Sequence, residues 1–251
     1  MDTILILGDG PLGRAVEAAS RDRAAPDAGD PGPRVRLRGR PSGNRHDPAD
    51  LADVDVVVEA SRADVVVANL SAALEAGCRR FVIATTGWAT DRPHVEAMLR
   101  AHGAAAVAAS NFSLGVVLFA RLVETAVDLF GPLDDFDPYL LEWHRRSKRD
   151  RPSGTAGDLA RRIVAAHPRL ANPDDLEVVS IRAGASPGMH LVGFDALGET
   201  VELRLTARDR SAYAAGILVA ADWLVRVRRE PGLHPFEPIV DELIAHPLIA
   251  A

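Results

Sequence analysis

The sequence predicts an α/β protein with two domains. The first is an N-terminal Rossmann-type parallel sheet with helices on both faces, and the second is a C-terminal α+β domain with an open mixed sheet. Three observations lead to this fold class. Strand and helix patterns alternate over about the first 110 residues, a long amphipathic pattern follows Asn111, and the segments beyond it read mainly as strands.

The first domain begins with a strand that we expect to be covered on both faces. Thr3–Leu7 is a continuous apolar run that ends at Gly8, which is typical of a parallel sheet. Similar runs predict strands at residues 35–38, 55–59, 81–84 and 104–108. Helical spacing of apolar residues predicts helices between them at 12–20, 64–76 and 95–101. This alternation implies right-handed crossovers in one sheet.

The second domain has a different order of elements. A long helix is predicted from Leu114 to near Gly131, and a further helix at residues 155–166. Strands are predicted at 136–143, 176–181, 190–194 and 200–206, the last with regular alternation of apolar and polar residues. We expect the apolar helix at 212–227 to pack back on the first domain. The first domain then comprises residues 1–112 and 212–251, and the second comprises residues 113–211.

Composition restricts the classes of function. The chain has 251 residues and a net charge of −6, and its arginines are scattered apart from the cluster at 145–151, so we expect no broad nucleic-acid-binding face. Cys78 is the only cysteine, which excludes an internal disulfide and a cysteine-rich metal site and fits a reducing, cytoplasmic setting. No apolar run approaches the roughly 20 residues of a membrane span, and no basic signal region precedes the first strand. We therefore expect neither membrane insertion nor secretion.

A glycine-rich turn follows the first predicted strand and reads Gly8-Asp9-Gly10-Pro11-Leu12-Gly13. This is the dinucleotide fingerprint in its proper context, between a strand and a helix. Small residues let the backbone approach a pyrophosphate, whose charge is met by N–H groups at the helix start. The alternative interpretation is an ordinary glycine turn.

Two arginines near the end of the second predicted strand bear on the choice of cofactor. The acidic residue expected there for an adenosine ribose is absent, and Arg38 and Arg40 lie near that place. Because arginine suits a 2′-phosphate, we expect NADPH or NADH with a preference for NADPH. The alternative is that these arginines lie on a loop and do not contact the cofactor.

The segment from Glu142 to Ala156 carries most of the chemistry. It contains His144, Lys148, several further cations, and a Ser153-Gly154-Thr155 turn that leads into a predicted helix. Ser153 is expected to cap that helix, while the N–H groups of Gly154 and Thr155 would hold a carboxylate. The alternative interpretation is a solvated basic loop before a capped helix.

Other candidate residues give weaker signals. The remaining histidines show no ligand spacing, so we expect surface or capping roles and no metal site: His46, His94, His102, His167, His190, His234 and His246. The serines considered as nucleophiles lack the strand–turn–helix context of a hydrolase: Ser61, Ser71 and Ser186.

The segment that begins at Glu142 resembles the Glu-x-His-His-x-x-Lys-x-Asp-x-Pro-Ser-Gly-Thr-Ala motif of the 4-hydroxy-tetrahydrodipicolinate reductase (dihydrodipicolinate reductase) family. Ala84-Thr85-Thr86-Gly87-Trp88 is similar to the family's Gly-Thr-Thr-Gly-aromatic turn. Ser110-Asn111-Phe112-Ser113-Leu114-Gly115 is similar to its Asn-Phe-Ser-x-Gly hinge. The resemblance extends over almost the whole chain, and its central motif is highly specific.

The resemblance implies a reductase of diaminopimelate and lysine synthesis. His144 and Lys148 would handle the proton and anchor the substrate, with Gly154 and Thr155 on a substrate carboxylate. The glycine loop would hold the cofactor pyrophosphate. The nicotinamide would be bordered by Ala84, Thr85, Thr86, Ser110, Asn111 and Phe112. Hydride would pass to a conjugated cyclic imine dicarboxylate in the second domain, which would also assemble a homotetramer through its sheet.

The chain departs from the family pattern at three places. Arg145 stands where the family has its second, substrate-contacting His, and it would add a permanent bidentate carboxylate donor. The glycine loop is one residue shorter than usual, and Ala84 replaces a glycine. Two alternatives therefore stay open: a paralogous reductase of another cyclic imine, and a catalytically silent nicotinamide-binding protein. The presence of both His144 and Lys148 argues against a catalytically silent protein.

Overall fold

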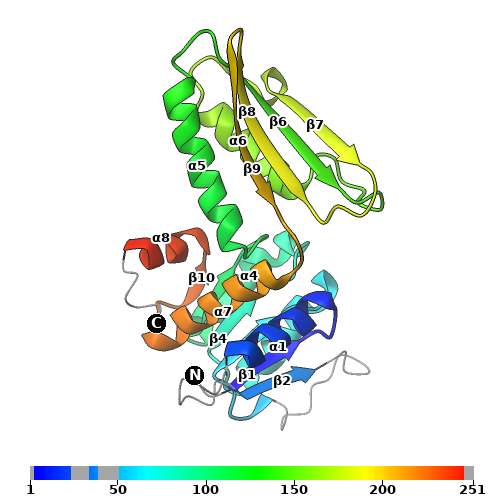
Figure 1. The fold of residues 1–251 in the computed structure, drawn as a ribbon. Helices are drawn as coiled ribbons and strands as arrows, with labels where there is room; N and C mark the ends of the chain where they lie inside the picture. The colour runs from blue at the N-terminus through cyan, green and yellow to red at the C-terminus, as the bar shows by residue number, and fades with distance from the viewer. Residues whose placement is uncertain (1–2, 24–33, 39–50, 246–251) are drawn as a thin grey trace. The chain divides into compact units, whose positions relative to one another are not determined.

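The computed structural model describes residues 3–23, 34–38 and 51–245 (Figure 1). The chain divides into two compact units. Unit 1 comprises Met1–Leu114 and Arg210–Ala251, and unit 2 comprises Gly115–Asp209. Within the described residues, no helix has both the length and the apolar character needed to cross a membrane.

Unit 1 contains a six-stranded sheet in the order β10-β5-β4-β3-β1-β2, in which every neighbouring pair is parallel. Its strands are β1 (Thr3–Leu7), β2 (Arg34–Arg38), β3 (Val56–Glu59), β4 (Arg80–Ile83), β5 (Ala105–Ala108) and β10 (Gly232–His234). The predicted Rossmann-type sheet is confirmed. Strand β10 was not predicted, because three residues are too few to show a periodic pattern.

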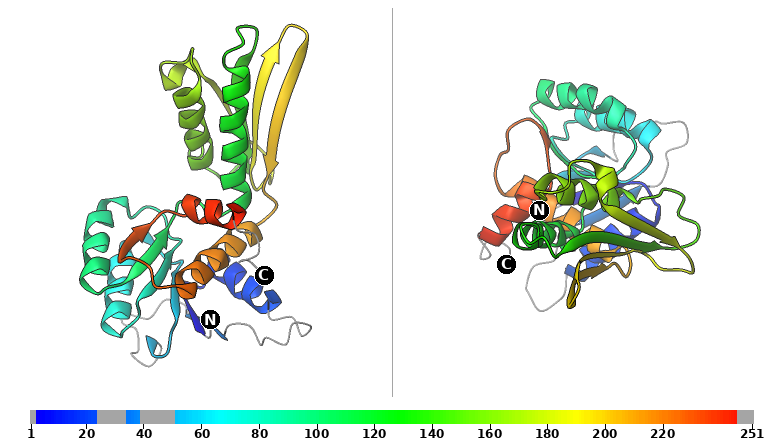
Figure 2. Two further views of the ribbon diagram at one scale, coloured as in Figure 1. Left: turned by 90° about the vertical axis from the view of Figure 1, so that its left-hand side faces the viewer. Right: turned by 90° about the horizontal axis from the view of Figure 1, so that it is seen from above.

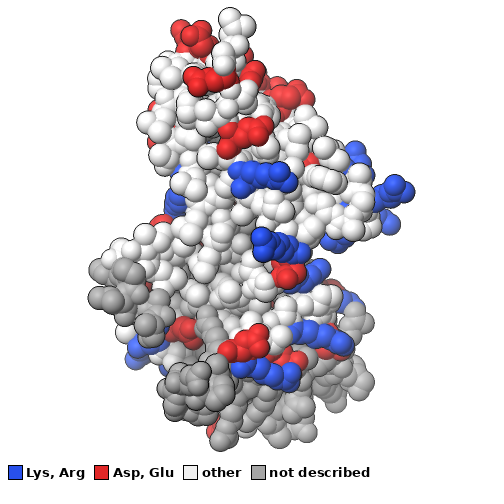
Figure 3. Space-filling view, viewed as in Figure 1, with Lys and Arg blue, Asp and Glu red and all other residues white. Residues whose placement is uncertain are grey.

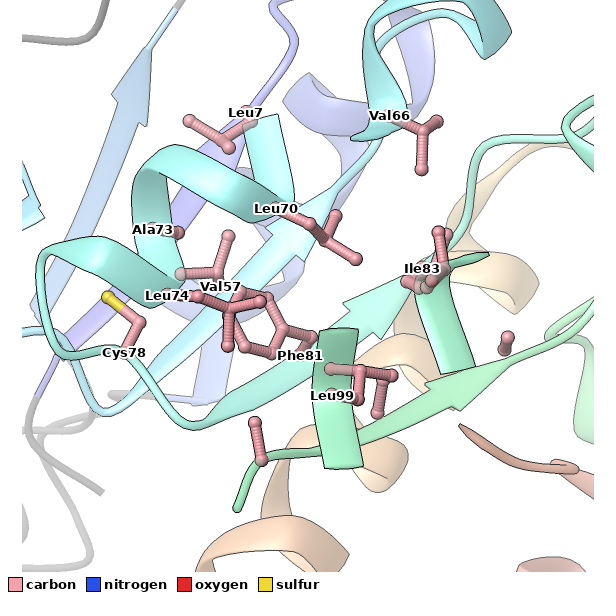
Figure 4. Packing of buried hydrophobic residues seen from close by; sticks show 14 of the residues in the cluster. Leu7, Val57, Val66, Leu70, Ala73, Leu74, Cys78, Phe81, Ile83 and Leu99 are labelled. Atoms are coloured by element: carbon pink, nitrogen blue, oxygen red, sulfur yellow. The ribbon is translucent and has the colours of Figure 1, made fainter. Parts of the chain in front are cut away.

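Helices cover both faces of this sheet, as predicted. Helices α1 (Pro11–Arg23) and α7 (Ser211–Arg226) pack together on one face, while α3 (Val66–Glu75) and α4 (Arg92–Ala101) lie on the other (Figure 2). Short 3-10 turns at Ala63–Val65 and Ala89–Asp91 precede α3 and α4. Alternate strand residues join the apolar faces of α3 and α4 in a fully buried core that includes Val57, Leu70, Phe81, Ile83 and Leu99 (Figure 4).

The C-terminal segment packs on unit 1. Helix α7 packs against β3, β4 and β5, and its Gly216 lies so close to the loop after β5 that a Cβ there would be 1.7 Å from the Phe112 carbonyl oxygen. The Phe112 and Phe236 rings also pack with centroids 5.0 Å apart. Helix α8 (Glu237–Ala245) follows and was not predicted. These contacts make unit 1 discontinuous in sequence.

Unit 2 contains a four-stranded sheet in the order β7-β6-β8-β9. Its strands are β6 (Asp137–His144), β7 (Glu177–Arg182), β8 (Met189–Ala196) and β9 (Glu199–Thr206). Strand β6 is parallel to β7 and antiparallel to β8, and β8 is antiparallel to β9, so the predicted mixed sheet is confirmed.

One face of this sheet is covered and the other is open. Helices α5 (Leu114–Phe130) and α6 (Gly154–Ala166) pack on the covered face over Leu140, Val192 and Phe194, and a 3-10 turn (Pro173–Asp175) precedes β7. The opposite face exposes three apolar side chains that are 37–40% accessible: Trp143, Val179 and Ile181.

Candidate active site

A row of polar side chains crosses the covered face of the unit 2 sheet. The alternation of β6 turns Glu142 and His144 inward, where both are buried. The strand register places Ser180 of β7 and His190 of β8 on either side of Glu142, and Arg182 beside His144. The pleat and the register of three strands therefore assemble this cluster.

Glu142 is the centre of the cluster. Its Oε1 accepts hydrogen bonds from the Ser153 backbone N–H at 2.9 Å, the Ser180 hydroxyl at 2.6 Å and Arg182 Nη2 at 2.6 Å. Burial by itself raises the pKa of Glu142, but the hydrogen bonds from Ser153, Ser180 and Arg182 outweigh burial and lower the pKa to about 2. Glu142 is thus an anion at neutral pH.

The His144 ring lies beside the second oxygen of Glu142, and neither facing atom makes a hydrogen bond within the described part of the chain. Its Nδ1 lies 3.2 Å from Oε2, and its Nε2 points toward Gly188, where a Cβ would be 3.1 Å away. Burial lowers the pKa of His144, the Glu142 charge raises it, and the charges of Lys148 and Arg182 lower it further, with a net decrease. The ring is therefore mainly neutral near pH 7.

His190 is a site residue that the sequence interpretation placed wrongly, as a surface or capping residue. It is buried, its Nε2 lies 3.3 Å from the Ser153 hydroxyl, and its ring meets the His144 ring edge-on at 5.3 Å between centroids. Burial, followed by the influence of His144, lowers its pKa to about 4. A signal was available, since polar residues at inward strand positions are unusual: Ser180, Arg182 and His190.

The start of α6 is fixed to this cluster. Ser153 caps the helix as predicted, because its hydroxyl accepts from the Ala156 N–H at 3.2 Å. The Ser153 amide donates to Glu142, so both polar groups of Ser153 are engaged inside the protein. Gly154 is exposed, and a Cβ there would meet nothing within 4 Å. A ligand carboxylate at this helix start would therefore meet Gly154 and Thr155.

The loop between β6 and α6 carries the predicted cations. Lys148 Nζ lies 2.8 Å from an Asp150 carboxylate oxygen, and its side chain is 24% exposed. Arg182 Nη2 also donates to the Asp150 carbonyl at 2.5 Å, which ties the loop to β7. Arg145 is exposed and donates to the Ser147 hydroxyl at 3.1 Å.

Three side chains of the cluster have the chemistry of metal ligands. Donor atoms of Glu142, His144 and His190 lie within 4.8 Å of one another. The expected lack of a metal rested on the dispersal of histidines along the chain, which does not hold for His190 in space. Electrostatics still disfavours a cation, because the Arg182 guanidinium already binds Glu142 and Lys148 adds charge nearby.

The predicted cofactor residues all lie at the carboxyl edge of the unit 1 sheet. Residues 8–10 join β1 to α1, and residues 11–13 begin α1. Residues 84–86 follow β4, and residues 110–112 follow β5. Strand order reverses between β1 and β3, which is where open α/β sheets bind nucleotides. Arg38 ends β2 and pairs in register with Leu7, while Arg40 lies outside the described residues.

The glycine turn has the packing that a phosphate loop needs. Gly8 has a φ of +118°, and a Cβ there would lie 2.4 Å from the Ala60 carbonyl oxygen. A Cβ on Gly13 would lie 1.9 Å from the Gly8 carbonyl oxygen, so α1 packs closely on β1. Gly10 has open space, with nothing within 4 Å of a Cβ. Two glycines therefore serve packing, and the third leaves room for a ligand.

Unit 2 should lose stability in mild acid because His190 is held neutral. Between pH 6.5 and about 4 the unfolded chain binds a proton at His190 that the folded chain does not, so the free energy of unfolding should fall as pH falls through this window. One such group contributes at most about 1.4 kcal/mol per pH unit. Urea unfolding from pH 7 to 5 should show a smaller slope for His190→Asn than for wild type. Replacing exposed His102 is the control, and equal slopes for His190→Asn and wild type would contradict the assignment.

Comparison with known proteins shows which family the chain resembles. The family model for the C-terminus of dihydrodipicolinate reductase matches residues 115–239. A 4-hydroxy-tetrahydrodipicolinate reductase of Wolinella succinogenes is 36% identical over 200 residues, which cover 73% of this chain and 75% of the relative. One of Archaeoglobus fulgidus is 32% identical over 203 residues, 75% of this chain and 77% of the relative.

A solved structure shares the fold. Dipicolinate-bound dihydrodipicolinate reductase from Paenisporosarcina sp. TG-14 aligns with a TM-score of 0.71 and 19% identity, over 95% of this chain and 99% of that chain. The resemblance found in the sequence is thereby confirmed. The chain belongs to the 4-hydroxy-tetrahydrodipicolinate reductase family of oxidoreductases.

Proposed function

We propose that the protein reduces 4-hydroxy-tetrahydrodipicolinate to tetrahydrodipicolinate with a nicotinamide cofactor, in diaminopimelate and lysine biosynthesis. Unit 1 binds the dinucleotide, and unit 2 binds the substrate. One observation within unit 2 carries the proposal: the Glu142 carboxylate binds the start of α6 through one oxygen and lies 3.2 Å from His144 Nδ1 through the other. A group that can transfer a proton and a helix start that can bind a carboxylate therefore lie on the same buried carboxylate.

Recognition of the substrate rests on its two carboxylates. The first turn of α6, at Gly154 and Thr155, offers backbone N–H groups and the positive end of a 13-residue helix. Arg145 is exposed on the preceding loop and presents a planar guanidinium suited to a second carboxylate. Lys148, on the same loop as Arg145, is a further positive group that could bind a carboxylate.

Proton transfer uses the Glu142–His144 pair or Lys148. His144 is mainly neutral before substrate binds, because burial lowers its pKa. A dianionic substrate would favour the charged ring and raise that pKa. The ring would then take up a proton on Nε2, with Nδ1 3.2 Å from the negatively charged Glu142 Oε2. General acid assistance of this kind is worth roughly 10²–10⁴-fold in rate.

The cofactor supplies the hydride, and the residues of unit 1 fit it. Tight packing at Gly8 and Gly13 and open space at Gly10 suit a pyrophosphate on the glycine turn. Thr85, Thr86 and the segment Ser110–Phe112 would border the nicotinamide. Arg38, at the end of β2, favours NADPH over NADH.

A second candidate keeps the fold and the hydride chemistry but changes the substrate. Arg145 favours it, because a permanent cation replaces the titrating ring that the family motif has at this place. The protein would then reduce a different cyclic imine that carries a carboxylate within reach of Arg145.

Activity should be measured as NADPH oxidation with freshly generated 4-hydroxy-tetrahydrodipicolinate. We expect rapid turnover by the wild type and a loss of at least about 100-fold in Lys148→Ala, because a positive group is removed from the site. Arg149→Ala, one residue along the same loop, is the matched control and should stay close to wild type. Wild-type activity in Lys148→Ala would remove this residue from the mechanism.

The same assay separates the remaining choices. A higher kcat/KM with NADPH than with NADH is expected, and a preference for NADH would overturn the role given to Arg38. If the wild type binds NADPH but does not turn over this substrate, a panel of cyclic imines tests the second candidate.

We further propose a homotetramer assembled through the open face of the unit 2 sheet. That face exposes Trp143, Val179 and Ile181, and an unpaired apolar sheet face is an expected interaction surface. Sedimentation at about four times the 26.8 kDa chain mass is expected. Ile181→Glu should give smaller species, and a monomeric wild type would contradict the proposal.

The proposed partners are limited to substrate, cofactor and further copies of the chain. On the face shown in Figure 3, basic side chains stand singly or in small groups among acidic and uncharged ones. This distribution does not favour a nucleic-acid surface. A single cysteine supports a cytoplasmic setting.

A further inference from the structure

A second buried carboxylate lies in unit 1, far along the chain from the Glu142 cluster. Glu59 ends β3, is completely buried, and follows three buried valines. Its Oε1 accepts from the Ser61 N–H at 2.9 Å, from the Ser61 hydroxyl, and from the Thr85 hydroxyl at 3.2 Å. Its Oε2 accepts from the Asn69 amide at 2.7 Å. Every one of these donors is uncharged.

The backbone around Glu59 joins the same turns. The Glu59 carbonyl accepts from the N–H groups of Ala84 at 2.8 Å and Thr85 at 3.1 Å. The Ala60 N–H donates to the Leu7 carbonyl at 2.9 Å, and the Ala60 carbonyl fills the space that a side chain on Gly8 would need. The turns that follow β1, β3 and β4 are therefore held together at Glu59.

Stability does not explain an acidic residue at this position. Burial raises the pKa of Glu59, and the hydrogen bonds from Ser61, Asn69 and Thr85 offset this increase only in part. An apolar side chain would continue the Val56–Val58 pattern without that penalty. The carboxylate instead provides hydrogen-bond acceptors in defined directions. It accepts hydrogen bonds from the turns after β3 and β4 and from α3 at the same time.

We propose that Glu59 is a positioning residue for the cofactor, which fixes the turns at residues 8–10, 60–61 and 84–86 in the geometry that receives the reduced dinucleotide. The inference rests on the proposed function, because that function assigns the first and third of these turns to cofactor binding. Glu59 acts through Ser61, Asn69 and Thr85, and it does not itself touch the cofactor.

The test uses Glu59→Gln in the full-length protein. The glutamine has nearly the same shape but is uncharged and has an NH₂ group in place of one acceptor oxygen, so the donors of Ser61, Thr85 and Asn69 can no longer all be accepted in their present arrangement. We expect the calorimetric Kd for NADPH to rise at least tenfold. Faster hydrogen exchange should be confined to the amides of Ser61, Ala84 and Thr85.

Two further variants separate positioning from general destabilisation. Val82→Ala removes buried volume from β4 of the same sheet and should lower the melting temperature while the NADPH Kd stays within twofold of wild type. Asn69→Leu removes one donor to Glu59, keeps a similar side-chain shape outside the residues assigned to the cofactor, and should weaken NADPH binding even if Glu59→Gln fails to fold.

The outcomes distinguish this inference from the proposed function. NADPH binding by wild type together with unchanged binding by Glu59→Gln and Asn69→Leu would overturn the positioning role and leave the proposed function intact. Equal weakening by Val82→Ala would also overturn the positioning role, because loss of stability would then explain the effect. Failure of the wild type to bind NADPH or NADH would overturn both.

Discussion

The hydrogen bonds of the Glu142 carboxylate are the interaction on which the site depends. One oxygen holds the start of α6, β7 and Arg182, and the other faces the His144 ring. Removing one partner of such a buried ion pair typically costs about 3–5 kcal/mol, because the remaining charge stays buried. The groups that we propose for proton transfer and for carboxylate binding are therefore parts of one cluster.

Glu142 and Glu59 are both buried carboxylates, but different partners stabilise them. Glu142 is paired with Arg182, and its pKa is lowered, so it remains charged beside the His144 ring. Glu59 has only neutral donors, and its pKa is raised. The first carboxylate suits a place where charge must be handled. The second suits a place where only backbone geometry matters, at the sheet edge where we propose that the cofactor binds.

Periodicity in the sequence was enough to predict most elements, because a buried parallel strand and an amphipathic helix each leave a local pattern. The short strand β10 leaves none. The cap at Ser153 was predictable for the same local reason. His190, Ser180 and Arg182 were missed as site residues because strand register brings them to Glu142 from 38 to 48 positions away, and no local pattern encodes register. The roles of His144 and Lys148 came mainly from the family motif.

The most direct test of this account is the steady-state kinetics of Glu142→Gln with NADPH and 4-hydroxy-tetrahydrodipicolinate. Ser180→Ala, which removes one donor and keeps the carboxylate, is the control. The account predicts a fall in kcat/KM of at least about 100-fold in Glu142→Gln, with the NADPH Kd and the circular dichroism spectrum unchanged. Turnover by Glu142→Gln within threefold of wild type would contradict it.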